Sequence, residues 1–242
     1  MRKFNIAFSI CGEGHGHYGR NIEIIRELSK RLPESSITLY LYGDSLEIFK
    51  LDKNLPKNVA IKEIPGFRFK YRDDGFLTSL LSTAFNKTNW AVFLETVWLT
   101  LFHILTTPLL KMVSLLTKKK ILFKNFYKKY FDEFDFAITD LEPLLPRVAL
   151  IRGKPFLTFD NQHAMLYGDI EIKKFQFKER LEHFFVCTFL KTYHPRSDLS
   201  ILTTFCEIPI KEKYKNRVVA VGPLFRKDIA KLKGKERYED FI

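Results

Sequence analysis

The sequence predicts an α/β fold built on a Rossmann-like, doubly wound parallel sheet. Three observations predict it. Seven short runs of β-branched and aromatic residues are flanked by turn residues, as the buried strands of a parallel sheet are. Helical patterns alternate with these runs, which is typical of β-α-β units. The chain of 242 residues is 46% hydrophobic, so it can bury a large core.

The expected strands are the apolar runs Phe4–Cys11, Ile37–Tyr42, Val59–Ile64, Phe134–Thr139, Pro155–Phe159, Leu199–Thr203 and Arg217–Val221. Apolar residues recur at helical spacing after the first and the fourth of these runs, at Ile22, Ile25, Leu28, Leu32, Leu144, Val148 and Ile151. One helix is therefore expected from about Tyr18 and another from Pro143. In such a sheet, ligands bind beyond the carboxyl ends of the strands.

The segment from Pro65 to Tyr130 breaks this alternation and is expected to be an inserted helical region. Residues 91–116 are strongly apolar, but charges such as Glu95 and the break at Pro108 argue against a membrane-spanning helix. Lysines interleaved with aromatic residues follow, up to Tyr130. Two interpretations stay open for 91–130: a core helix with a solvated lysine face, or a surface that docks on an anionic membrane.

The net charge of +12 indicates a polyanionic partner, such as a nucleic acid, an anionic membrane surface or a phosphorylated ligand. Nucleic-acid binding would require a salt-sensitive interaction through the lysine and aromatic cluster 118–130. Cys11, Cys187 and Cys206 have no C-x-x-C spacing, so neither a disulfide framework nor a zinc site is expected. A cytoplasmic location is expected, with peripheral binding to the inner face of the cell membrane as a further expectation.

A glycine-rich loop with two histidines, GEGHGHYGR, follows the first strand directly. Glycine allows tight turns and close approach to a ligand, and the first amides of the following helix favour an anion. Histidine in such a loop can transfer protons near neutral pH. The loop is therefore predicted to bind a phosphate-bearing or sugar-like ligand through the residues Gly12, Gly14, His15, Gly16, His17 and Arg20.

The same loop also fits the dinucleotide-binding pattern G-x-G-x-x-G at Gly14, Gly16 and Gly19, with Asp44 after the second strand. However, the match begins three residues beyond the end of the first strand. Two histidines also crowd the place where a pyrophosphate must meet bare backbone. Neither a nicotinamide cofactor nor any other cofactor is therefore expected.

Two further polar clusters follow expected strands. Asp140 and Glu142 come after the fourth strand, where each carboxylate can either cap the next helix or bind substrate and orient a base. The fifth strand ends in four consecutive polar residues that could form a site for sugar hydroxyls, Asp160, Asn161, Gln162 and His163.

Together these segments resemble the amino-terminal half of GT-B glycosyltransferases, nearest to the MurG-like enzymes that transfer N-acetylglucosamine from a UDP donor. The resemblance rests on a G-x-G-x-G-H-x-x-R loop, a D-x-E-P segment, a K-P-x-x-x-x-D-N-Q-H segment and a V-G-P-x-x-R exit at 221–226. It implies that His17 is the general base on the acceptor hydroxyl, with His15 as a second candidate. It also implies that Asp140 or Glu142 orients or charge-pairs that imidazole.

The resemblance implies a transfer of a hexosyl or N-acetylglucosaminyl group from a UDP-sugar to a lipid-linked or polysaccharide acceptor. Residues 1–226 would form the acceptor-side domain, and 227–242 would begin a linker to a carboxyl-terminal donor domain. Activity would then need that donor-binding half, in the same protein or as a separate subunit. The alternative is a noncatalytic, membrane-associated subunit that recruits or activates a donor-binding partner.

Overall fold

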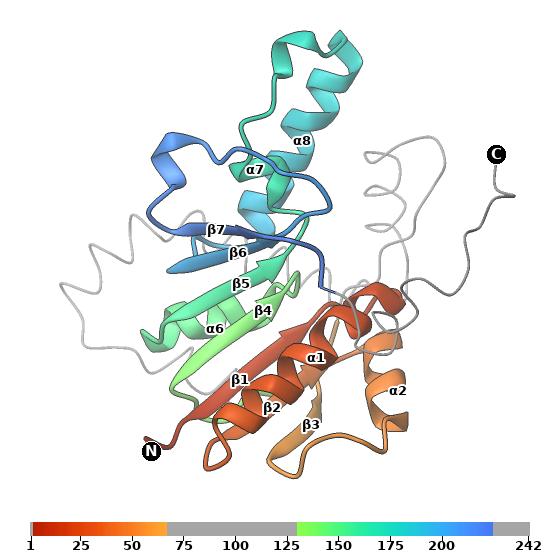
Figure 1. The fold of residues 1–242 in the computed structure, drawn as a ribbon, viewed down its shortest axis with the longest axis vertical. Helices are drawn as coiled ribbons and strands as arrows, with labels where there is room; N and C mark the ends of the chain where they lie inside the picture. Colours follow the sequence, from red (N-terminus) through yellow and green to blue (C-terminus); the bar gives the residue numbers. More distant parts are fainter. Residues whose placement is uncertain (1, 67–129, 225–242) are drawn as a thin grey trace, which may run out of the picture.

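The computed structural model describes residues 2–66 and 130–224, which form a single seven-stranded sheet (Figure 1). Every pair of neighbouring strands is parallel, and the order across the sheet is β3-β2-β1-β4-β5-β6-β7. The strands are β1 (Asn5–Ile10), β2 (Ser36–Leu41), β3 (Val59–Glu63), β4 (Phe136–Asp140), β5 (Phe156–Asp160), β6 (Leu199–Thr203) and β7 (Val218–Val221). The predicted doubly wound α/β fold is confirmed.

Helices and short 3-10 turns connect the strands. They are α1 (His15–Arg31), α2 (Gly43–Leu51), α6 (Leu144–Arg152), α7 (Ala164–Tyr167), η2 (Ile172–Lys174), α8 (Phe177–Tyr193) and η3 (Glu212–Tyr214). Helix α1 begins at His15, three residues before the expected start at Tyr18. The cause is Gly14, whose φ of 73° turns the chain into the helix within one residue.

Two apolar layers hold the sheet between its helices, because alternate residues of a strand point to opposite faces. Ile6 and Phe8 of β1 pack on one face with Ile22 of α1 and Phe49 of α2. On the opposite face, Ala7 joins a cluster with α6 and with aromatic residues just before β4. Both faces of the central strands are therefore covered, and buried hydroxyls within the sheet bond to each other, as Thr158 does to Ser200.

The strand order reverses between β1 and β4, which makes the carboxyl ends of these two strands the topological switch point of the sheet. The chain leaves β1 through α1 toward β2, whereas it leaves β4 through α6 toward β5. The two loops that follow β1 and β4 therefore diverge. Both of these loops carry polar residues singled out from the sequence.

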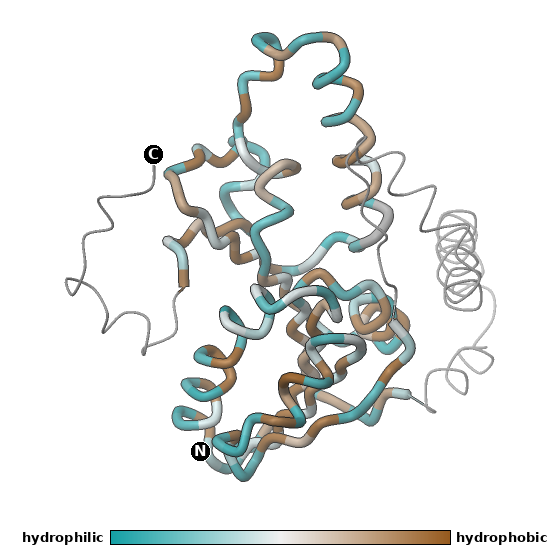
Figure 2. The backbone as a smooth tube through the Cα atoms, turned by 90° about the vertical axis from the view of Figure 1, so that its right-hand side faces the viewer, coloured by the Kyte–Doolittle hydropathy of each residue, from teal (hydrophilic) through white to brown (hydrophobic). Residues whose placement is uncertain are grey.

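The expected helical segment 91–130 lies outside the described residues except for Tyr130, and so does the expected linker 227–242. Among the residues that the structure describes, none of the helices is long and apolar enough to cross a membrane. The longest projecting element is α8, whose first turns extend beyond the sheet and carry hydrophobic and hydrophilic residues alternately (Figures 1 and 2).

Candidate active site

The glycine loop after β1 is fixed by close contacts with the start of α2. A Cβ on Gly12 would lie 2.2 Å from the Tyr42 ring and 2.6 Å from the Tyr42 carbonyl oxygen, so only glycine fits there. The Gly14 amide donates to Asp44 Oδ2 at 3.1 Å, and the Asp44 amide donates to the Gly12 carbonyl at 2.8 Å. These contacts place the first turn of α1 at the switch point.

Asp140, the last residue of β4, is the centre of the site. Its side chain is fully buried, and it accepts hydrogen bonds from His17 Nδ1 at 2.9 Å and from Arg20 Nη2 at 2.5 Å. The side-chain amide of Asn21 also donates to it. Three donors on successive turns of α1 therefore converge on one carboxylate that comes from the other side of the switch point.

This arrangement ionises both partners. Burial opposes the charge on Asp140, but the His17 and Arg20 cations lower the pKa of the carboxyl below its usual value. Burial also works against a charged His17, yet the Asp140 carboxylate outweighs it and raises the pKa of the imidazole from 6.5 to about 10. With no substrate bound, His17 is therefore an imidazolium paired with Asp140 at neutral pH.

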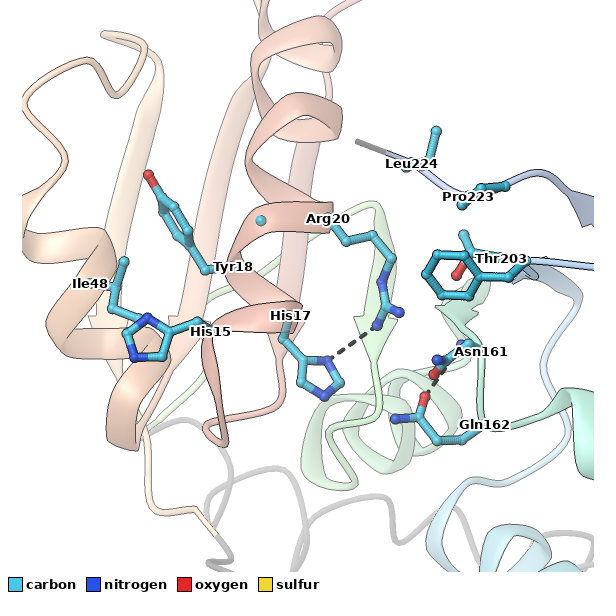
Figure 3. Close-up of a pocket in the computed structure, with 13 residues that line it drawn as sticks. His15, His17, Tyr18, Arg20, Ile48, Asn161, Gln162, Thr203, Pro223 and Leu224 are labelled. Atoms are coloured by element: carbon cyan, nitrogen blue, oxygen red, sulfur yellow. Dashed lines mark hydrogen bonds between the residues drawn. The ribbon is translucent and has the colours of Figure 1, made fainter. Parts of the chain in front are cut away.

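The hydrogen bond also sets which imidazole nitrogen can meet a substrate. Nδ1 is committed to Asp140, so Nε2 is the nitrogen without a carboxylate partner. The His17 side chain remains 13% exposed, whereas Asp140 is completely covered. Figure 3 shows the His17 ring at the edge of a pocket, with Arg20 beside it. The buried Asp140 carboxylate thus fixes the orientation of the His17 ring through Nδ1.

Glu142, the other carboxylate of this segment, has a different role. Its Oε1 accepts the Leu144 amide at 2.7 Å and its Oε2 accepts the Leu145 amide at 2.9 Å, so it caps the start of α6. Burial raises the pKa of Glu142. Among the described contacts, none joins it to His17. The geometry thus gives Glu142 a capping position, whereas Asp140 is the carboxylate that bonds to His17.

The four polar residues after β5 divide into two pairs. Asp160 and His163 are buried and bond to each other: Asp160 Oδ1 accepts the His163 amide at 2.8 Å, and Oδ2 accepts its Nδ1 at 2.7 Å. Asn161 and Gln162 lie between them and face the pocket (Figure 3). Direct substrate contact is therefore open to Asn161 and Gln162, whereas Asp160 and His163 lie behind them.

His194, at the end of α8, completes a buried group with Asp160 and His163. Each of the three offers one ligand atom within 4.8 Å of the others, which is a spacing that could hold a metal ion. Both Asp160 oxygens already accept a hydrogen bond from His163, one from its amide and one from its Nδ1. Within the described residues, this is the group whose chemistry would suit a cation.

The pocket has a volume of about 740 Å³ and lies between the start of α1 and the ends of β5, β6 and β7 (Figure 3). The residues that line it and were predicted from the sequence are His15, Gly16, His17, Arg20, Asn161 and Gln162. Sequence reasoning missed the remaining lining residues, Tyr18, Gly19, Ile48, Thr203, Phe205, Pro223 and Leu224. Thr203 ends β6, so the rule that ligands bind at strand ends could have found this side of the pocket.

Two residues of the dinucleotide pattern, Gly19 and Asp44, have other surroundings in the structure than that motif requires. In that motif the third glycine is needed for close helix–strand packing. A Cβ on Gly19 would meet nothing within 4 Å, so the residue has no such packing role here. Asp44 is bonded to the Gly14 amide, in contact with the loop itself.

Comparison with known proteins adds a family and a fold. A family model described as "Glycosyl transferase family 1" matches residues 101–240. No curated protein matches the sequence. Among solved structures, a UDP-glucose:anthocyanidin 3-O-glucosyltransferase in complex with UDP aligns with a TM-score of 0.51 and 15% identity, over 92% of this chain and 53% of that one.

A UDP-glucosyltransferase from Polygonum tinctorium aligns with a TM-score of 0.48 and 13% identity, over 99% of this chain and 56% of that one. The chain therefore spans about half the length of the solved proteins that it resembles. The likeness to the anthocyanidin glucosyltransferase places the sheet and its helices in the GT-B type of fold.

Proposed function

The chain belongs to glycosyl transferase family 1, and we propose that it supplies the acceptor site and the general base for sugar transfer from a UDP-sugar to an acceptor hydroxyl. One observation carries the proposal. A histidine at the edge of a pocket is held by a fully buried carboxylate at the switch point of the sheet. An alcohol nucleophile requires a positioned base of this kind, because its hydroxyl must lose a proton as it attacks.

In the proposed reaction, His17 Nε2 removes the proton from the acceptor hydroxyl. The oxygen then forms a bond to the anomeric carbon of the sugar, and the bond from that carbon to the diphosphate breaks, so that UDP leaves with the bonding electrons. Asp140 stays ionised throughout and stabilises the imidazolium that forms. A positioned base of this kind contributes roughly 10²–10⁴-fold to the rate.

The His17 pKa of about 10 adds one requirement to this mechanism. His17 must give up its resting proton before it can accept one from the acceptor, so transfer is expected to speed up as the pH rises above neutrality. The resting imidazolium and Arg20 also make this part of the pocket positive, which suits an acceptor or donor that carries phosphate.

UDP as the nucleotide is supported by the solved glucosyltransferase that shares this fold, which contains UDP. The sequence motifs favour a hexosyl or N-acetylglucosaminyl group as the sugar and a lipid-linked or polysaccharide acceptor. Since the chain spans about half of its structural neighbours, we assign most of the donor site to a second half that is supplied by the same protein or by a partner.

The test is a transfer assay with radiolabelled UDP-N-acetylglucosamine or UDP-glucose and a set of lipid-linked and polysaccharide acceptors. The full chain is assayed alone and together with a donor-binding half. His17→Ala is expected to abolish transfer while the fold is retained. The matched control is His15→Ala, because His15 lines the same pocket and the described hydrogen bonds of Asp140 come from His17, Arg20 and Asn21.

Substantial transfer by the His17 variant, or a loss confined to the His15 variant, would contradict the assignment of the base. Normal recruitment of a donor-binding partner without any transfer would instead favour the noncatalytic alternative.

A further inference from the structure

We propose that Asp160 and His163 are positioning residues, which hold Asn161 and Gln162 in place as the wall of the acceptor pocket that faces His17. The proposal deepens the proposed function and rests on it for the identity of the ligand. It concerns a different part of the fold, since the residues follow β5, whereas the acid–base pair joins α1 and β4.

The first argument is the closed turn after β5. Asp160 and His163 are three residues apart, and both carboxylate oxygens of Asp160 are used by this one partner, at 2.8 Å by its amide and at 2.7 Å by its imidazole. Both side chains are at most 2% exposed. The two ends of the turn are thereby tied together underneath the surface, and the two middle residues are forced outward.

The second argument is the packing behind His163. Its ring stacks on Tyr167, with ring centroids 5.5 Å apart, and lies 5.1 Å from the ring of His194. Tyr167 in turn contacts Tyr214 edge to face, and the Arg217 guanidinium lies over the Tyr167 ring. His163 therefore cannot rotate away from Asp160 without disturbing an aromatic stack that reaches as far as β7.

The third argument is electrostatic. Burial disfavours the charge on Asp160, but His163 lowers the pKa of the carboxyl to about 2, so Asp160 is an anion at neutral pH. His194 is kept neutral, because burial lowers its pKa to about 3. The two hydrogen bonds that Asp160 accepts from His163 are therefore bonds to a charged group, which are among the stronger ones in proteins.

The consequence appears at the pocket. Asn161 and Gln162 line it across from His17 and Arg20, and Figure 3 shows their amide groups on the opposite wall. Amide groups can both donate and accept, so they suit sugar hydroxyls next to the reacting one. A shift of this wall would misplace the acceptor relative to His17 Nε2 without touching the base itself.

The test compares Asp160→Ala, which removes both hydrogen bonds, with Asp160→Asn, which keeps an oxygen for the His163 amide. The matched control is Thr158→Val. It breaks the buried 2.8 Å hydrogen bond between Thr158, which lies in the same strand as Asp160, and Ser200 of β6. Amide hydrogen exchange is measured on the full chain. Asp160→Ala is expected to speed exchange at residues 161–163 at least about tenfold, Asp160→Asn less, and Thr158→Val not at all.

Transfer kinetics then show whether Asp160 positions the pocket wall or only supports the fold. With UDP-N-acetylglucosamine and a polyprenyl-linked sugar as the probes, Asp160→Asn is expected to raise the acceptor KM about tenfold and to leave the pH dependence of kcat unchanged. In a chain that already carries Asn161→Ala and Gln162→Ala, adding Asp160→Asn is expected to change the acceptor KM little further. The amide groups that Asp160 positions are then gone.

Three results would overturn the proposal: wild-type exchange at 161–163 in Asp160→Ala, additive effects in the double-mutant cycle, or stoichiometric zinc in the purified chain. Zinc would make Asp160, His163 and His194 ligands in place of a positioning group. If the wild-type chain transfers no sugar to any acceptor even together with a donor-binding half, the proposed function fails, and the exchange experiment still decides whether Asp160 holds this wall.

Discussion

Replacing Asp140 by asparagine should return His17 to an ordinary or lower proton affinity, which makes this the sharpest test of the acid–base pair. The carboxylate is the largest influence that raises the pKa of His17 to about 10, and burial acts in the opposite direction. When the carboxylate is removed, burial remains. Arg20 Nη2, which lies 3.2 Å from His17 Nδ1, then faces the imidazole and disfavours its charged form.

The size of the effect follows from the same values. A pKa that falls from about 10 to 6.5 or below is a loss of roughly 1,000-fold or more in proton affinity, at ~1.4 kcal/mol for each tenfold step. The stability of the wild type has a matching pH dependence. Because the folded pKa lies above the unfolded one, the pair stabilises the protein fully below pH 6.5 and loses this contribution as the pH rises through about 10.

The assay is a pH titration of the six histidines by NMR, with the His17 signal assigned from its absence in His17→Ala. Asp44→Asn is the control, since Asp44 bonds to the Gly14 amide in the same loop and has no described bond to the imidazole. Chemical denaturation between pH 6 and 10 should show that the wild type loses stability more steeply than Asp140→Asn. A His17 pKa that stays near 10 in Asp140→Asn would refute the reasoning.

Two further predictions concern the rest of the motif. Gly12→Ala should destabilise the fold strongly, because its Cβ would lie 2.6 Å from the Tyr42 carbonyl oxygen, whereas Gly19→Ala should stabilise α1 by roughly 0.5–1 kcal/mol in urea denaturation. Equal effects of the two changes would contradict the close approach at Gly12. Glu142→Ala should cost about 1–2 kcal/mol of stability, because the capping of α6 is lost, and it should leave the His17 pKa unchanged. A shift of the His17 pKa in this variant would show instead that Glu142 acts on the imidazole.

The sheet could be predicted closely from the sequence, because its central strands are buried on both faces and are therefore apolar runs in the sequence. All seven expected strands overlap the observed ones, with ends that differ by at most two residues. The start of α1 was misplaced because periodic apolar residues begin only at Ile22, whereas the helix is started by the backbone of Gly14. Local periodicity locates the middle of an element better than its ends.

The site could be predicted in part, and the misses share one physical cause. Spacing along the chain does not show whether a polar side chain turns outward or is satisfied by a near neighbour. Asp160 and His163 bond to each other, and Glu142 bonds to the next helix, so these three residues face inward. Phe205 was missed for the converse reason, since an isolated aromatic residue in a loop carries no pattern, although it lines the pocket.

The bond between His17 and Asp140 joins residues that are 123 positions apart in the chain. During synthesis, β1, α1 and β2 leave the ribosome long before β4, so the segment that carries the histidine exists for some time without its acid. Until β4 pairs beside β1, His17 lacks the carboxylate that raises its pKa. The raised pKa of His17 thus appears only with the long-range pairing of β1 and β4, and non-local pairing of this kind is slow to form.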